Sequence, residues 1–179
     1  MYLFETDRLR CYSLSISDYA AFEAGVEPNW EGFTNPYKHL IKGPSPLAFR
    51  IPRVKKDPSF ADIGLILAVN KISNEVIGSA GFHDFPDDNG MIEIGFGIVP
   101  QMQNQGFGKE LLMGMWLMIS KRPDVKVLRY TVAPDNEPSM HIINNLGFDK
   151  VGEQIDPEDG LELIFEKSVS DFLSKFSNL

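Results

Sequence analysis

The segment PQMQNQGFGKELLMGMWL, Pro100 to Leu117, joins a loop of amides and glycines directly to an apolar helical segment. Gly106 and Gly108 lie at the corner where a predicted strand gives way to this helix. The first backbone N–H groups of a helix have no partner within it, and the helix dipole favours an anion there. Because glycine leaves such a corner open, the pattern predicts a loop that binds a phosphate or a diphosphate.

Two familiar phosphate-binding loops do not fit this segment. A P-loop would require glycine at position 103 and serine or threonine at position 110, where the chain has Gln103 and Glu110. A dinucleotide-binding fingerprint that starts at Gly106 would require glycine where Leu111 stands. The loop is therefore expected to bind its anion in another way.

The surrounding sequence predicts a mixed α/β sheet. Runs of apolar and β-branched residues predict strands within 6–15, 91–99, 125–133, 148–154 and 161–169, and a hairpin within 63–82 that turns at Ser73 and Asn74. Helices are expected from near Ser17 within 15–26, within 109–121, and within 137–145 before Gly147. The helix within 109–121 is apolar on nearly every face, so we expect it to be buried.

Residues 27–60 differ in character from the rest of the chain. Six of the twelve prolines fall there, and Trp30, Phe33, Tyr37 and Phe49 are interleaved with them. We expect no long regular element in this stretch. Two interpretations stay open, a proline-stiffened surface connection with a few core anchors and a substrate-binding lid.

Composition and charge limit the classes of function. With 179 residues and 43% hydrophobic composition, the chain suits one domain over 1–179. A formal net charge of -8 argues against a general nucleic-acid binder and suits cationic partners such as amines. The single cysteine, Cys11, is expected to pack in a strand, and it excludes an internal disulfide and a Cys-rich zinc site.

Location, metals and assembly are judged from what the sequence lacks. No signal segment opens the chain and no run of about 18 apolar residues could span a bilayer, so we expect a cytoplasmic protein without membrane contact. The three histidines, His39, His83 and His141, show no metal-binding spacing, and no metal is expected. The oligomeric state is left open, with a homodimer as one option.

The pattern Gln103-x-x-Gly106-x-Gly108 resembles the pyrophosphate loop of the GNAT superfamily of N-acetyltransferases. Upstream, EIGFGIVP is similar to the splayed strand of that family, which pairs with the pantetheine arm of acetyl-CoA. Downstream, APDNEPSMHIINNLGF resembles the next strand end and helix of the family. The opening ETDRLR and the segment NEPSMHIINNLGF are most similar to the RimJ/RimL branch, which acetylates protein N-terminal amines.

The resemblance implies a single-domain GNAT-like acyl-CoA N-acyltransferase fold, an α/β fold with a mixed central sheet, a splayed strand and flanking helices. It also implies acetyl-CoA as co-substrate. The backbone around the loop would cradle the diphosphate, and the splayed strand would offer hydrogen bonds to the pantetheine amides. The implied cofactor-binding residues are Phe96, Gly97, Ile98, Val99, Gln103, Asn104, Gln105, Gly106, Phe107, Gly108, Lys109, Asn136 and Ser139. Lys109 is equally well a solvated lysine, and Asn136 equally well a helix cap.

Catalytic roles follow from the same resemblance. Glu93 is the candidate base, acting through water, and its alternative is a glutamate on the solvent face of a strand. A backbone N–H at Gly97 or Ile98 would hold the oxyanion. Many family members have a tyrosine acid where this chain has Ile143, and Ser139 is the candidate substitute, unless it only starts a helix.

The acceptor side and the overall function are inferred last. Trp30 and Phe33, in the proline-rich stretch, and His83, at a strand end, are the candidate substrate-binding residues. The predicted function is transfer of the acetyl group of acetyl-CoA to a primary amine by direct attack, with a protein N-terminus or a small-molecule amine as acceptor. The alternative is a GNAT-fold sensor or interaction module that binds acyl-CoA without turnover.

Overall fold

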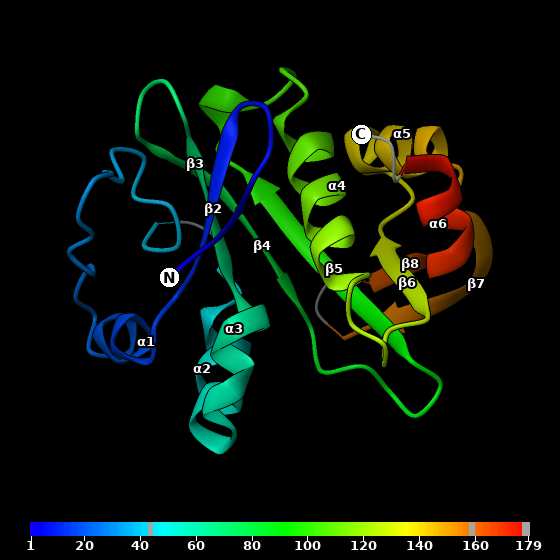
Figure 1. Ribbon diagram of the computed structural model, residues 1–179, viewed down its shortest axis with the longest axis horizontal. Coiled ribbons are helices and arrows are strands. Elements are labelled where there is room, and N and C mark those ends of the chain that lie inside the picture. Colours follow the sequence, from blue (N-terminus) through cyan, green and yellow to red (C-terminus); the bar gives the residue numbers. More distant parts are fainter. Residues whose placement is uncertain (43–44, 158–159, 177–179) are drawn as a thin grey trace. The chain divides into compact units, whose positions relative to one another are not determined.

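The computed structural model describes residues 1–42, 45–157 and 160–176 (Figure 1). The chain forms two compact units, one made of 1–83 with 96–115 and the other of 84–95 with 116–179. Strand β5 (Met91–Ile98) and helix α4 (Phe107–Ile119) each have a part in both units. The expectation of one domain over the whole chain stays a prediction.

The first unit contains an antiparallel sheet in sequence order. Its strands are β1 (Tyr2–Glu5), β2 (Leu9–Ser13), β3 (Ile66–Asn70) and β4 (Val76–Phe82). Every residue of β3 and β4 is buried, which explains why both read as continuous apolar runs. Strand β4 adjoins the carboxyl-terminal part of β5, where Val99 N donates to Ile77 O over 2.9 Å.

Short helices complete the first unit. They are α1 (Ile16–Glu23), α2 (Leu47–Lys56), α3 (Ala61–Gly64), the 3₁₀ helices η1 (Pro58–Phe60) and η2 (Pro100–Met102), and the first part of α4. Helix α1 packs on α2, and α3 contacts β2 and β4 (Figure 1). A capping box begins α1, because Ser15 Oγ accepts from Asp18 N while Asp18 Oδ2 accepts from Ser15 N.

The second unit contains the rest of the sheet. Strands β5, β6 (Val127–Val132), β8 (Gly160–Ser168) and β7 (Asp149–Asp156) follow one another in that order. The pair β5–β6 is parallel, with Ile92 opposite Leu128, and the other two pairs are antiparallel. Two helices belong to this unit, α5 (Glu137–Leu146) and α6 (Val169–Phe176), and Gly147 ends α5 in the left-handed region at φ 71°.

The strand order is therefore β1-β2-β3-β4-β5-β6-β8-β7, an eight-stranded mixed sheet. The predicted α/β class with a mixed sheet and flanking helices is confirmed. The hairpin of β3 and β4 is also confirmed, and Asn74 takes the left-handed conformation in its turn, at φ 56°. Helix α4 is buried as expected, with Leu111, Leu112 and Met115 fully inaccessible.

One expectation about residues 27–60 is wrong, because α2 is a regular helix of ten residues that continues through Pro52. Its buried face, formed by Leu47, Arg50 and Val54, offsets the backbone hydrogen bond that proline cannot donate. The preceding part of the stretch has core anchors: Leu40 is buried and Thr34 N donates to Asn74 O over 2.9 Å. Gly43 and Pro44 lie outside the described residues, and the lid interpretation stays a prediction.

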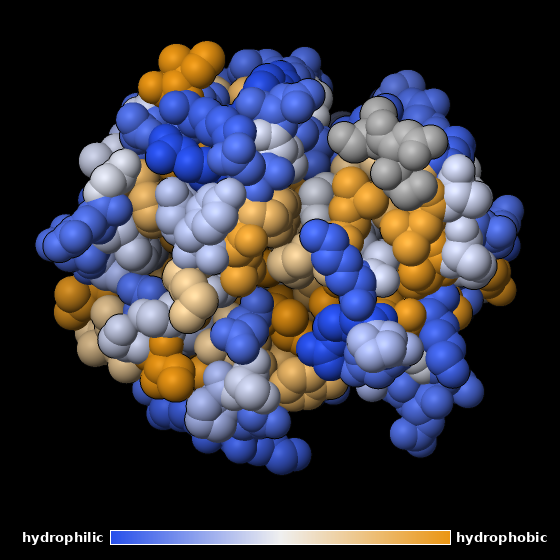
Figure 2. Space-filling model, viewed as in Figure 1, coloured by the Kyte–Doolittle hydropathy of each residue, from blue (hydrophilic) through white to orange (hydrophobic). Residues whose placement is uncertain are grey.

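Aromatic side chains build the core of the second unit. The Trp116 ring stacks on Phe148 with centroids 4.5 Å apart and meets Phe172 of α6 edge-on at 5.8 Å. The face drawn in Figure 2 is largely hydrophilic, with hydrophobic residues showing between the polar ones. In the part of the chain that the structure describes, no helix has the length and apolar character needed to cross a membrane.

Candidate functional site

The loop that begins at Gln103 contains two residues with a positive φ before α4 begins. Asn104 has φ 59° and Gly106 has φ 81°, so both take the left-handed conformation that glycine and asparagine tolerate best. Helix α4 starts at Phe107, and its first helical bond of this turn runs from Glu110 N to Gly106 O over 3.1 Å. The N–H groups of the first helical turn lack partners within the helix, which suits them to an anion.

Polar side chains of the loop fold back onto its own start. Gln103 Nε2 donates to Ile98 O over 2.8 Å, and Gln105 Nε2 reaches Gln101 O at 3.4 Å. One hydrogen of the Gln103 side-chain amide thus contacts the strand, and the second is left for another acceptor. Lys109 is exposed at the first turn of α4.

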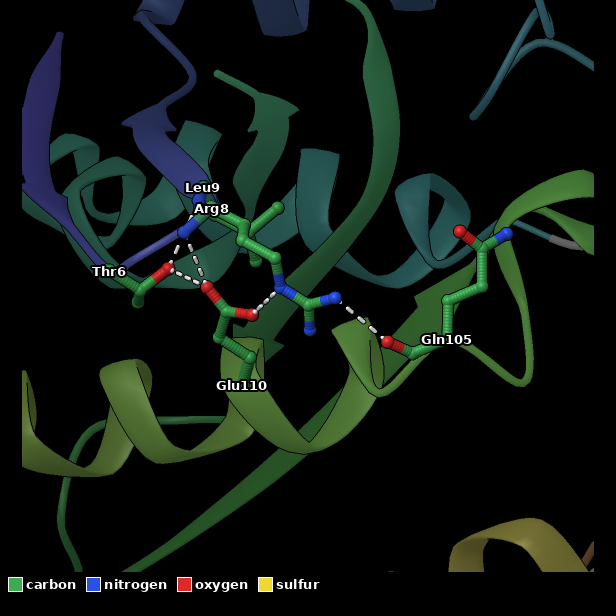
Figure 3. A network of polar contacts seen from close by, with 5 residues as sticks. All are labelled: Thr6, Arg8, Leu9, Gln105 and Glu110. Atoms are coloured by element: carbon green, nitrogen blue, oxygen red, sulfur yellow. Dashed lines mark hydrogen bonds and ion pairs between the residues drawn. The ribbon is translucent and has the colours of Figure 1, made fainter. Parts of the chain in front are cut away.

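A network of polar contacts fastens this loop to the turn between β1 and β2 (Figure 3). Arg8 Nη1 donates to Gln105 O over 2.9 Å, and Arg8 Nε donates to Glu110 Oε2 over 2.6 Å. Glu110 Oε1 accepts from Thr6 Oγ1 at 2.5 Å and from Arg8 N at 2.8 Å, and Thr6 Oγ1 accepts from Leu9 N. The Arg8 guanidinium also lies over the Phe107 ring, 4.2 Å from its centroid.

Glu110 is the charged centre of that network. Burial alone would raise its pKa, but hydrogen bonds from Thr6 and Arg8, together with the Arg8 charge, lower the pKa below its ordinary value. The carboxylate therefore stays ionised at neutral pH. Its charge adds to the effect of burial on Cys11, whose thiol pKa rises to about 12, so that cysteine is an inert core residue of β2.

The carboxyl-terminal end of β5 is close to β4 at one glycine and open at another. A side chain at Gly78 would meet the carbonyl oxygen of Gly97 at less than 3.0 Å. A side chain at Gly97 would meet nothing within 4 Å. Phe96, Gly97 and Ile98 are half-buried, and Val99 is buried. The backbone at Gly97 is therefore open to an approaching group, as its candidate role requires.

Glu93 lies on β5 in the second unit. It is half-buried and opposite Arg129 of β6, and its Oε1 accepts from Thr131 Oγ1 over 2.6 Å. Arg129 itself pairs with Glu166 of β8, with Nε 2.8 Å from Glu166 Oε1. Glu93 is thus held in place by β6, and both interpretations, a base and a glutamate on the solvent face of a strand, stay open.

Ser139 and Asn136 come together at the start of α5. Asn136 is the N-cap, and its Oδ1 accepts from Ser139 N at 3.2 Å. The Ser139 hydroxyl in turn accepts from the Tyr130 hydroxyl at 3.2 Å. Burial raises the pKa of Tyr130, with the hydrogen bond to Ser139 acting the other way. Ile143 is fully buried and offers no proton.

The aromatic candidates of the proline-rich stretch pack on one another. The Trp30 and Phe33 rings stack with centroids 5.5 Å apart, Tyr12 lies 4.9 Å from Phe33, and Trp30 Nε1 donates to Asp18 Oδ1 at 3.1 Å. The side chains of Tyr12, Asp18, Trp30 and Phe33 are all half-buried, so part of this cluster stays accessible. His83 follows β4 at an exposed position.

Sequence reasoning missed three contributors to these arrangements, namely Arg8, Tyr130 and Thr131. Arg8 meets Glu110 across 102 residues, and no local pattern predicts such a pair. Tyr130 and Thr131 alternate along β6, so strand periodicity places them on opposite faces without naming their partners. Among the described residues no group of three or more His, Cys, Asp or Glu could hold a metal ion.

Comparison with known proteins gives one consistent family. A family model described as an acetyltransferase (GNAT) domain matches residues 8–149. YjdG of Bacillus subtilis (strain 168), described as an uncharacterized N-acetyltransferase, is 30% identical over 157 residues, which cover 83% of this chain and 90% of YjdG.

Solved structures show the same fold at low sequence identity. The spermidine/spermine N-acetyltransferase SpeG from Vibrio cholerae, solved in mutant forms, has a TM-score of 0.67 at 13% identity, covering 95% of this chain and 99% of SpeG. RimL, a ribosomal L7/L12 α-N-protein acetyltransferase solved with coenzyme A, has a TM-score of 0.64 at 15% identity, covering 94% of this chain and 98% of RimL.

Proposed function

Because the chain belongs to the GNAT family of N-acetyltransferases, we propose that it moves the acetyl group of acetyl-CoA to a primary amine by direct attack. The observation that carries this proposal is the loop before α4, in which Asn104 and Gly106 both take the left-handed conformation ahead of the first turn of the helix. Such a loop has the form of a backbone cradle for a diphosphate. The coenzyme A complex of RimL, a protein of the same fold, supports the choice of ligand.

The loop residues Gln103 to Lys109 bind the diphosphate through their backbone in this proposal. Lys109 is exposed, so its ammonium can add charge without any loss of internal contacts. The end of β5, from Phe96 to Val99, offers backbone hydrogen bonds to the pantetheine amides. The open backbone at Gly97 supports this role, as does its use as an oxyanion donor, worth roughly 2.7 to 4 kcal/mol when well placed.

Glu93 is the proposed general base, acting through water. An amine with a pKa of about 8 to 10 is largely protonated at neutral pH, so a proton must leave before attack. The hydrogen bond from Thr131 Oγ1 to Glu93 Oε1 supports the role, because it fixes the position of the carboxylate. A carboxylate held in one position is what a base acting through water needs.

Ser139 is the proposed donor to the leaving thiolate. Its oxygen accepts from the Tyr130 hydroxyl, so the Ser139 proton is left to be donated to another acceptor. A thiol with a pKa of about 8.5 needs little help to leave as thiolate, so the expected contribution of Ser139 is modest. Asn136, which caps α5, would contact the pantetheine arm only through the part of its amide that the cap does not use.

The acceptor is proposed to be a cationic or N-terminal amine. SpeG acts on spermidine and spermine by name, and RimL on the α-amine of a ribosomal protein, so relatives in fold cover both acceptor classes. The formal net charge of -8 supports attraction of either. The half-buried rings of Trp30 and Phe33, beside Asp18, are the proposed contact surface, since aromatic faces and carboxylates both attract ammonium groups.

The test separates binding from turnover. Acetyl-CoA affinity is measured by calorimetry, and turnover is measured as thiol release with spermidine and with short peptides. Replacing Glu93→Gln is expected to lower kcat by about 100-fold, within the range for loss of a general base, while the Kd of acetyl-CoA stays within about twofold. The control is Glu153→Gln, a change at an exposed position on β7 that should alter neither quantity.

Two outcomes would contradict this proposal in different ways. Normal turnover by the Glu93 variant would remove Glu93 as base while leaving the acetyltransferase in place. Failure of the unaltered protein to bind acetyl-CoA would overturn the proposed function itself.

A further inference from the structure

Arg8 contacts the diphosphate loop and the helix that follows it at the same time. Its Nη1 donates to Gln105 O at 2.9 Å and its Nε donates to Glu110 Oε2 at 2.6 Å (Figure 3). Its guanidinium also lies over the Phe107 ring. The Arg8 side chain keeps 44% of its surface exposed, against 16% for Glu110. One cation thus restrains both sides of the corner at Gly106.

The contact with Gln105 fixes a direction in the loop. The described residues contain no cis peptide, so the C=O of Gln105 and the N–H of Gly106 point in opposite directions from one peptide plane. Because the carbonyl points toward Arg8, the N–H of Gly106 points away from it. Arg8 therefore sets the orientation of a donor in the proposed cradle.

The contact with Glu110 removes an electrostatic obstacle. Glu110 is in the first turn of α4, the turn whose N–H groups are proposed to hold a diphosphate. An ionised carboxylate there would repel the anion. The Arg8 guanidinium supplies the compensating charge through its Nε, and the backbone N of Arg8 donates a further, neutral hydrogen bond to Glu110.

We propose that Arg8 is a positioning residue for diphosphate binding, which orients the Gln105–Gly106 peptide and neutralises Glu110. This inference rests on the proposed function, since it concerns the same loop. Arginine suits the role because its planar fork serves two acceptors at once, which the single ammonium of lysine does not do in the same geometry.

The first test compares a ligand that has the diphosphate with one that lacks it. Arg8→Ala is expected to weaken coenzyme A binding by about tenfold, equivalent to ~1.4 kcal/mol, while binding of pantetheine stays unchanged. Arg8→Lys keeps the charge, so its affinity for coenzyme A is expected to lie between that of the unaltered protein and that of Arg8→Ala. The control is Arg122→Ala, which removes an exposed ion pair with Asp124 and should leave both affinities as they were.

The second test asks whether Arg8 acts through the Glu110 charge. Glu110→Gln keeps an acceptor for Thr6 and for Arg8 N but removes the charge, so coenzyme A affinity is expected to stay equal or to rise. Adding Glu110→Gln to Arg8→Ala is expected to restore several-fold of the lost affinity. If the Arg8–Glu110 contact had a merely structural role, the double variant would bind coenzyme A more weakly than either single variant, because it would lose more contacts.

A third measurement does not depend on any ligand. Amide hydrogen exchange in the loop from Gly106 to Lys109 should be faster in Arg8→Ala than in Arg122→Ala, because an unfixed peptide opens more often. If the unaltered protein binds no coenzyme A while exchange still responds to Arg8, the proposed function falls and the orienting role of Arg8 stands. Two results would overturn the inference while leaving the proposed function intact. One is an equal loss of affinity for coenzyme A and for pantetheine in Arg8→Ala, and the other is an amide exchange rate that does not change in that variant.

Discussion

His39 shows how the surroundings of one residue set its charge. It lies in the stretch between α1 and α2, where its Nε2 is 2.8 Å from the hydroxyl of Ser79, a buried residue of β4. Its backbone is fixed as well, because Asn35 Oδ1 accepts from His39 N and Asn35 Nδ2 donates to His39 O. Burial lowers the pKa of the imidazole from 6.5 to about 4, so His39 is neutral at physiological pH.

A pH dependence of stability follows from this lowered pKa. The unfolded chain binds a proton at His39 below pH 6.5, whereas the folded chain does so only near pH 4, so stability is complete above 6.5 and falls between 6.5 and 4. The expected loss at pH 5 is about 2 kcal/mol, or several degrees in Tm. Thermal unfolding at pH 7 and pH 5 should show a smaller drop for His39→Gln than for the unaltered protein. His141→Gln, an exposed histidine on α5, is the control, and equal drops in all three proteins would contradict the lowered pKa of His39.

Single residues also mark where sequence analysis stops. The glycines of the loop were found because glycine at a strand-to-helix corner has a direct conformational meaning, and Gly106 does take a positive φ. In the sequence, Arg8 has meaning only as part of the family-like opening ETDRLR, and Glu110 only as a residue that does not fit a P-loop. Their pairing depends on the packing of segments 102 residues apart, which no local pattern encodes.

At the scale of elements, two glycines of neighbouring strands differ in what surrounds them. A Cβ atom added at Gly78 of β4 would clash with the carbonyl oxygen of Gly97 of β5. A Cβ atom added at Gly97 would meet nothing within 4 Å. One glycine therefore serves the packing of the strands, and the other leaves room.

The matched pair of alanine variants tests this difference. Gly78→Ala is expected to destabilise the fold by about 1 to 3 kcal/mol, because the strands must shift to admit the methyl group. Gly97→Ala should change stability by less than about 0.5 kcal/mol and should weaken acetyl-CoA binding if the pantetheine arm passes there. Denaturant unfolding and calorimetry provide the two readings. A stable Gly78→Ala variant, or a Gly97→Ala variant that binds normally, would argue against the respective role.

The elements themselves were partly predictable. Strands β3, β4 and β6 and helix α5 follow from apolar runs and from Gly147 as a stop signal. Helix α2 was missed because Pro52 counts against a helix in a local reading, while the burial of one face is a tertiary effect. Helix α6 was missed although Ser168 Oγ accepts from Asp171 N at its start, because its 8 residues are too few for a clear helical period. Strand β1 is four half-exposed or exposed residues, too short for a periodicity.

At the scale of the whole molecule, the sequence, the fold and the relatives agree on the family, while the acceptor depends on finer features. The net charge of -8 suits a protein that attracts cationic substrates. Large exposed apolar side chains do occur, such as Ile72 at 92% and Ile155 at 75% exposure, and scattered residues of this kind are common on protein surfaces.

Acetyl-CoA binding to the unaltered protein and to two variants of the loop is the most direct test of the central claim. Calorimetry should show binding, and a hundredfold excess over Kd should stabilise the fold by about 2.7 kcal/mol, which raises Tm by several degrees. Gly106→Asp should abolish binding, because it places a negative charge in the cradle. Gly106→Asn, which fits the same left-handed backbone without the charge, should retain much of the affinity. If acetyl-CoA and other acyl-CoAs leave the calorimetric signal and the Tm unchanged, the loop does not hold a diphosphate and the acetyltransferase account is contradicted.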